Sequence, residues 1–68
     1  MKVIFDFGAN NGQNLNYFLE KADIVIAVEA NTNLVKEIKS NFKQFIDSKK
    51  LIVENILQKL YIYLAPIN

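Results

Sequence analysis

Apolar runs and amphipathic stretches alternate along most of the chain. Residues 3–5 form a short apolar run that leads through Asp6 into a loop at Gly8. Residues 24–28 form a longer run rich in branched side chains, and residues 51–53 form a third. The run at residues 24–28 is typical of a strand that is covered on both faces of a parallel sheet, and the two shorter runs are typical of strands as well. The pattern therefore predicts three strands.

The stretches between these runs have the periodicity of amphipathic helices. The first follows Gly12, and its apolar residues recur every three or four positions. The second follows Asn31 or Thr32, either of which can cap a helix. Its apolar residues all lie on one helical face, which predicts one helix with the buried side chains Leu34, Val35, Ile38, Phe42, Phe45 and Ile46.

The order strand, helix, strand, helix, strand predicts an α/β fold with a Rossmann-like parallel sheet, because parallel neighbours are joined by helical crossovers. Residues 60–64 have the aromatic and apolar content of a further strand, although residues 56–64 also fit one helical face. A chain of 68 residues is short for a whole domain. We therefore interpret residues 1–68 as one partial domain.

Composition excludes several kinds of chemistry. The chain has neither cysteine nor histidine, which removes disulfides, thiolate and imidazole metal sites, and nucleophiles that depend on a histidine base. Eight basic and seven acidic residues give a net charge of +1, without a basic run long enough to bind nucleic acid. We therefore expect no metal and no nucleic-acid partner, and the catalytic residues stay unknown.

The apolar runs are also too short for a signal peptide or a membrane span. Asp6 interrupts the first run after three residues, and the last run ends at Pro66. We expect a cytoplasmic protein that does not bind membranes.

A glycine-containing loop follows the first strand at residues 8–12, where doubly wound sheets bind their ligands. Gly8 can turn without steric cost and lets a ligand approach the backbone, and Gly12 lets the next helix begin close beneath the loop. Free N–H groups at such a place suit a carboxylate or a phosphate. Two glycines alone are equally consistent with a simple connection between strand and helix.

An acidic residue, Glu29, stands directly at the end of the second strand. Its separation from Gly12 is close to the roughly 20 residues at which an acidic side chain meets ribose hydroxyls in dinucleotide-binding folds. Alone, Glu29 is better interpreted as an exposed charge that closes a strand. The loop and the carboxylate together favour a ligand site.

Residues 4–12 and 26–31 resemble the opening of the FkbM-type methyltransferase family, whose loop has the pattern Asp-x-Gly-Ala-Asn-x-Gly. The resemblance implies a class I methyltransferase domain that transfers a methyl group from S-adenosylmethionine to a hydroxyl of a small molecule or a saccharide. This chain would be its N-terminal half, because the later strands of the family have no counterpart here. We expect such a fragment to be inactive alone.

The resemblance also implies roles for individual residues. Gly8, Ala9, Asn10 and Gly12 would form the loop that holds the methionine part of the cofactor, and Asp6 would brace that loop.

The ribose would lie at the end of the second strand. Glu29 would hold its hydroxyls, and Asn31 would cap the second helix beside it. The family often has proline where this chain has Ala30, which leaves the ribose contact intact. Glu54 follows the third strand, where related enzymes often contact adenine, but we interpret it as a solvated charge.

Two alternatives remain. The first is a nicotinamide-dinucleotide-binding fragment, which shares the layout but needs glycine where this chain has Asn10. The second is a non-catalytic truncated remnant or association module. In the sheet of the FkbM-type family the first strand is central. In this chain that strand would expose an unpaired edge, and we expect self-association through that edge.

Overall fold

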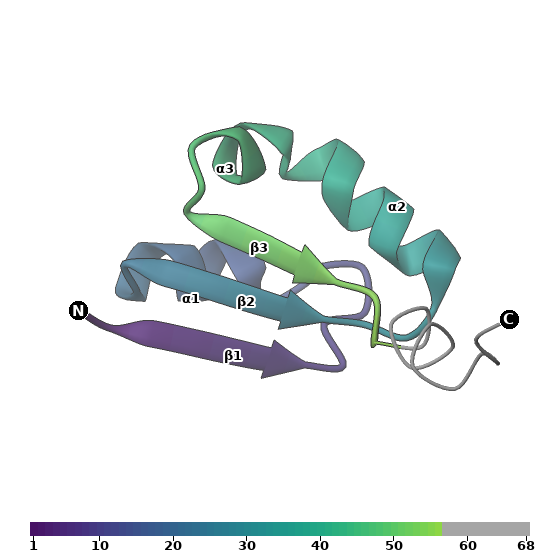
Figure 1. Ribbon diagram of the computed structural model, residues 1–68, viewed down its shortest axis with the longest axis horizontal. Coiled ribbons are helices and arrows are strands. Elements are labelled where there is room, and N and C mark those ends of the chain that lie inside the picture. The colour runs from purple at the N-terminus through teal and green to yellow at the C-terminus, as the bar shows by residue number, and fades with distance from the viewer. Residues whose placement is uncertain (57–68) are drawn as a thin grey trace, which may run out of the picture.

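The computed structural model describes residues 1–56 and shows a three-stranded parallel sheet with the order β1-β2-β3 (Figure 1). The strands are β1 (Val3–Phe7), β2 (Ile24–Val28) and β3 (Leu51–Glu54). The three predicted strands and their parallel arrangement are confirmed. The possible further strand at residues 60–64 lies outside the described residues.

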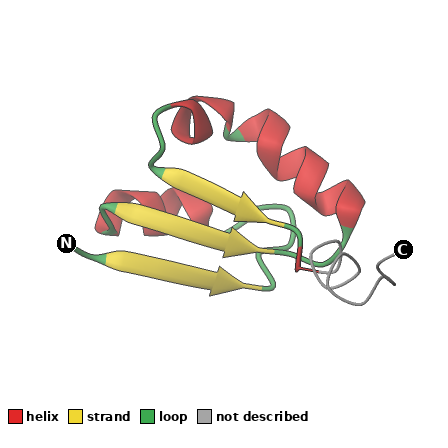
Figure 2. Cartoon of the chain, in the orientation of Figure 1, coloured by secondary structure: helices red, strands yellow, loops and turns green. Residues whose placement is uncertain are grey.

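Three helices connect the strands (Figure 2). Helix α1 (Leu15–Lys21) joins β1 to β2, and helices α2 (Thr32–Asn41) and α3 (Lys43–Asp47) join β2 to β3. The described part of the chain is therefore a small α/β unit. Within it, no helix has the length and apolar character needed to cross a membrane.

The prediction of one continuous second helix is wrong, because the helix breaks at Phe42. The backbone of Phe42 leaves helical geometry, with φ −117° and ψ 25°. Its N–H still donates to the carbonyl of Ile38 at 2.9 Å, and its own carbonyl accepts from Phe45 and Ile46 at 3.0 and 3.2 Å. Helix α3 therefore starts in a new direction, and Phe42 at the corner packs beneath Gly12.

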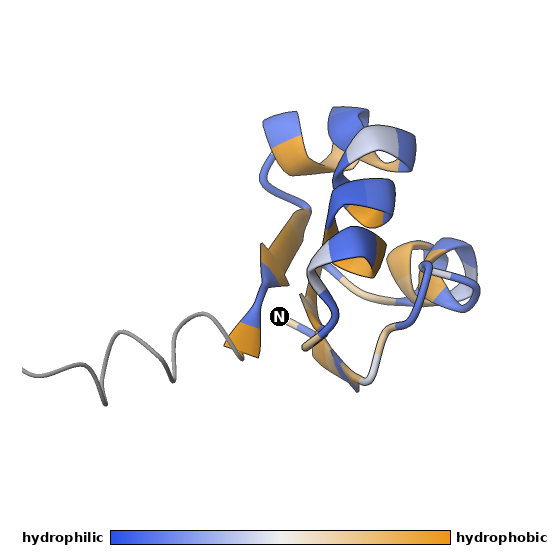
Figure 3. Ribbon diagram, turned by 90° about the vertical axis from the view of Figure 1, so that its right-hand side faces the viewer, coloured by the Kyte–Doolittle hydropathy of each residue, from blue (hydrophilic) through white to orange (hydrophobic). Residues whose placement is uncertain are grey.

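The core lies between the sheet and the helices, which all cover one face of the sheet (Figure 3). Side chains from each layer contribute to it because alternate strand residues point toward the helices. The largest fully buried side chains are Leu15, Val25, Ile38 and Leu51.

The opposite face of the sheet has no helix over it among residues 1–56 (Figure 3). Val3 is 40% exposed, Phe5 55%, Phe7 72% and Ile52 41%. The rings of Phe5 and Phe7 stack on this face with their centroids 5.8 Å apart. Apolar side chains thus form a continuous open surface.

Candidate functional site

The loop after β1 takes left-handed backbone conformations at alternate positions. The φ angles are 75° at Gly8, 58° at Asn10 and 88° at Gly12. Asparagine is one of the few side chains that tolerate this region. The N–H groups of Gly8 and Ala9 both donate to the carbonyl of Val28, at 2.8 and 3.1 Å. The loop therefore starts against the end of β2.

The two glycines are needed for different reasons. A Cβ added to Gly8 would meet no atom within 4 Å, so only its φ angle favours glycine and the space beside it is open. A Cβ at Gly12 would lie 2.7 Å from Cε2 of Phe42 and 3.1 Å from Cδ1 of Leu15. Gly12 therefore serves the packing of the loop on the corner between α2 and α3.

Glu29 connects this loop to the start of α2. Its Oε1 accepts a hydrogen bond from the main-chain N–H of Asn10, and its Oε2 accepts one from Asn31, both at 2.8 Å. Hydrogen bonds from the main chain of Asn31 and Asn10 hold the pKa of the Glu29 carboxyl below its usual value. The carboxylate is therefore ionised and fixed in place at neutral pH.

Asn31 caps α2, as predicted. Its side-chain Oδ1 accepts from the N–H groups of Asn33 and Leu34, at 2.9 and 3.2 Å. Because its own N–H donates to Glu29, Asn31 links the acidic side chain to the first turn of the helix. Asn10, Glu29 and Asn31 thus form one connected group.

Other predicted site residues play a different part. The side chain of Ala9 is 2% exposed and belongs to the core, so Ala9 contributes packing rather than a free surface. Asp6 makes no hydrogen bond to the loop within residues 1–56, so the structure gives no support to its bracing role. Its Oδ2 is buried without a partner there, and burial raises the pKa of its carboxyl.

Several main-chain donors of the loop are unused. Within the described residues, the N–H groups of Asn11, Gln13 and Asn14 donate to no acceptor. Unpaired N–H groups are strong donors that water or a ligand must satisfy. The loop therefore has unused donors beyond Asn10, the loop residue that bonds to Glu29.

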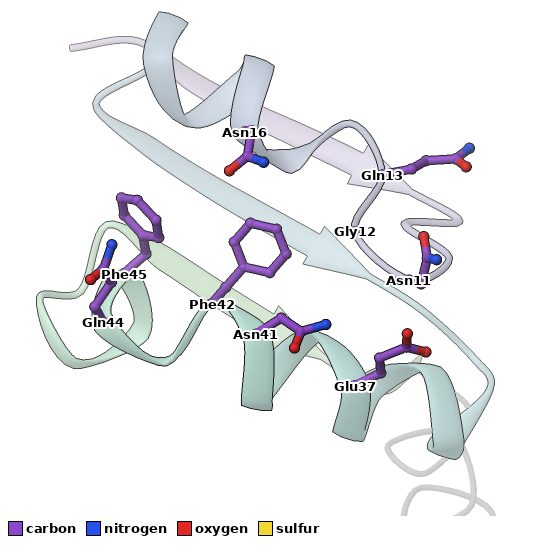
Figure 4. A pocket seen from close by; sticks show the side chains of 9 residues that line it. All are labelled: Asn11, Gly12, Gln13, Asn16, Glu37, Asn41, Phe42, Gln44 and Phe45. Atoms are coloured by element: carbon purple, nitrogen blue, oxygen red, sulfur yellow. The ribbon is translucent and has the colours of Figure 1, made fainter.

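A pocket of about 470 Å³ lies on the helix side of this loop, between α1 and the corner of α2 and α3 (Figure 4). Of the predicted cofactor residues, Gly12 alone lines this pocket, and Glu29 lies outside it. The rings of Phe42 and Phe45 and the carboxylate of Glu37 contribute to its wall. The remaining side chains are amides, which can donate and accept hydrogen bonds: Asn11, Gln13, Asn16, Asn41 and Gln44.

Sequence reasoning missed this amide lining because amides are ordinary on the outer faces of amphipathic helices. The only signal was the number of amide side chains near Gly12 and Phe42. These side chains line one pocket only because the fold brings the start of α1 close to the corner of α2 and α3. No group of acidic side chains in residues 1–56 has the arrangement of a metal site.

Comparison of the chain with models of protein families, with curated proteins and with solved structures gives no match.

Proposed function

We propose that residues 8–12 and Glu29 bind S-adenosylmethionine, as the cofactor-binding part of an FkbM-type methyltransferase with a Rossmann-like sheet. The observation that carries the proposal is the hydrogen bond from the N–H of Asn10 to Oε1 of Glu29. This hydrogen bond joins the two features of the sequence resemblance, the loop and the acidic residue, at the carboxyl ends of the parallel strands. Open α/β sheets bind their ligands at that end of the strands.

The hydrogen-bonding capacity of Glu29 fits a ribose. An ionised carboxylate has about four lone-pair sites, and the main-chain donors of Asn10 and Asn31 use one on each oxygen. The remaining sites can accept from two neighbouring hydroxyls. Because the main chain already holds the carboxylate, little side-chain freedom is lost when a ligand binds.

The loop fits the amino-acid part of the same cofactor. The open space beside Gly8 leaves room for a ligand against the backbone. The unused N–H groups of Asn11 and Gln13 can donate to a carboxylate. S-adenosylmethionine carries both groups that the site suits, a ribose and a carboxylate. By the family resemblance, the methyl acceptor would be a hydroxyl of a small molecule or a saccharide.

Asn10 favours S-adenosylmethionine over a nicotinamide dinucleotide. Its φ of 58° is the conformation that glycine takes readily, but its side chain occupies the position where the dinucleotide fingerprint needs glycine for the approach of pyrophosphate. S-adenosylmethionine has no pyrophosphate, so the side chain is compatible with it.

Titration of the ¹⁵N-labelled chain with S-adenosylhomocysteine and, separately, with NAD tests the proposal by NMR. We expect S-adenosylhomocysteine to shift the amide signals of residues 8–12 and 29–31, and NAD to leave them unchanged. Glu29→Gln should weaken binding by about tenfold or more, because it removes charge-assisted acceptors. Glu20→Gln, the same change on the exposed face of α1, is the matched control.

Preferential binding of NAD would contradict the choice of cofactor. If Glu29→Gln binds S-adenosylhomocysteine as tightly as the wild type, the ribose role of Glu29 is wrong.

A further inference from the structure

The outer edge of β1 has a defined hydrogen-bonding pattern. The carbonyl of Lys2 accepts from Ile24 in β2 at 3.3 Å, and the N–H of Gly8 donates to Val28 at 2.8 Å. Because the N–H and C=O of one residue in a parallel strand point to the same side, the even-numbered residues of β1 face β2. The odd-numbered residues, Val3, Phe5 and Phe7, direct their N–H and C=O groups outward.

This outer edge has no strand beside it among residues 1–56 (Figure 1). The strand is apolar apart from Asp6 and contains no proline, so it lacks the usual features that prevent an edge from pairing. Its open-face side chains are the exposed Val3, Phe5 and Phe7. The edge is thus a template for another strand.

Charge determines which strand fits. Lys2 directly precedes β1 and Asp6 is its penultimate residue, and by the alternation of the strand both lie, with Ile4, on the side of the sheet that carries the helices. In an antiparallel pair of two β1 strands centred on Ile4, Lys2 of each copy lies directly opposite Asp6 of the other. Two opposite-charge pairs form, since the arrangement is two-fold symmetric. Val3 then lies opposite Phe5, and their outward N–H and C=O groups exchange hydrogen bonds.

The unpartnered carboxylate supports this register. Within residues 1–56 the half-buried side chain of Asp6 and the exposed side chain of Lys2 take part in no ion pair, so both charges are available to a second copy. In this register, Lys2 of one copy and Asp6 of the other form a non-hydrogen-bonded pair. In such pairs of an antiparallel sheet the opposite side chains are closest. A register centred on Phe5 would instead place Ile4 opposite Asp6 and leave the carboxylate without a cation.

We propose that a second copy of this chain pairs antiparallel with β1 in the register centred on Ile4, through two Lys2–Asp6 ion pairs. The resulting sheet continues across both copies with all helices on one face. The open apolar faces of the two copies become one surface.

Charge exchange tests this register in the full chain by sedimentation velocity over a range of protein concentrations. Lys2→Glu should weaken dimerisation by about tenfold, because each attraction becomes a repulsion between like charges opposite each other. Asp6→Lys should weaken it similarly. The double variant Lys2→Glu with Asp6→Lys should restore dimerisation to near the wild-type level, since the pairs re-form with reversed signs.

Lys36→Glu, the same charge change on the exposed face of α2, should leave dimerisation unchanged. Circular dichroism of each variant reports whether it folds. If Asp6→Lys does not fold, Lys2→Glu still decides between the outcomes, because the Lys2 side chain is exposed and its replacement should not disturb the fold. A monomeric wild type overturns the proposal. So does a Lys2→Glu variant that dimerises like the wild type.

Discussion

The ring of Phe42 lies directly beneath Gly12, so that a Cβ at position 12 would be 2.7 Å from Cε2 of the ring. Gly12 also has a φ of 88°, a conformation that side chains rarely adopt. We expect Gly12→Ala to lower the free energy of unfolding by about 2–4 kcal/mol, from backbone strain and overpacking together. Urea denaturation followed by circular dichroism measures the change.

Gly8→Ala is the matched control for this prediction. Gly8 has a similar φ of 75°, but no atom lies within 4 Å of the position of its missing Cβ. It should therefore lose only about 1–2 kcal/mol, the cost of the left-handed conformation. Equal losses at Gly8 and Gly12 would show that the Phe42 contact is unimportant.

The cap of α2 gives a second prediction. Asn31→Ala removes the acceptor of two main-chain hydrogen bonds and should lower the free energy of unfolding by about 1 kcal/mol. Asn31→Asp should retain most of the stability, because a carboxylate oxygen can accept the same bonds. Asn33→Ala, a neighbouring exposed change without a side-chain bond, should have little effect in the same denaturation experiment. If Asn31→Asp is as unstable as Asn31→Ala, the cap is not the cause.

The hydrogen bonds to Glu29 predict a pH dependence of stability. Its folded-state pKa is lower than the ordinary value of 4.5, so its contribution is present above pH 4.5 and is lost as the pH falls through the folded-state pKa. The wild type should therefore be more stable than Glu29→Gln at neutral pH, with the difference shrinking below pH 4.5. Urea midpoints at a series of pH values test this. A difference independent of pH would mean that the charge of Glu29 is not involved.

Asp6 should have the opposite pH dependence. Burial raises its folded-state pKa above the ordinary value of 3.8, so its most favourable contribution is present below pH 3.8 and is lost as the pH rises through the folded-state pKa. Asp6→Asn should therefore stabilise the monomer at neutral pH, where the wild-type carboxylate is ionised, and the gain should disappear in acid. Denaturation at protein concentrations that keep the chain monomeric measures it. A destabilised Asp6→Asn monomer at neutral pH would contradict the argument.

Local signals in the sequence predicted the strands and the helix cap, because each depends on neighbouring residues. Residues 24–28 are apolar in a continuous run, and Asn31 precedes a helical pattern. The break at Phe42 could not be predicted in this way, since Phe42 continues the apolar face of the helix and leaves it to pack beneath a glycine far away in the sequence.

For the candidate site, the sequence predicted the positions of residues along the chain but not the contacts between them. The positions of Gly8 and Glu29 at the ends of adjacent strands followed from the alternation of strands and helices. That Glu29 bonds to the main chain of Asn10 could not be foreseen, because it depends on the left-handed turns of the loop. That the helices of residues 1–56 cover one face of the sheet only was also unpredictable, since the apolar runs look alike whether one face is covered or two.

The central place of β2 has a consequence for how the chain folds. Within the described residues, β1 and β3 each pair with β2 and not with each other. Each pairing joins segments separated in the sequence by at least one helix, and contacts between distant residues slow folding because a long loop must close first. Of the three described strands, β1 is synthesised first, and its partner β2 follows only at residues 24–28. Among the three described strands, the one with the most exposed apolar side chains is thus also the one that must wait for its first partner.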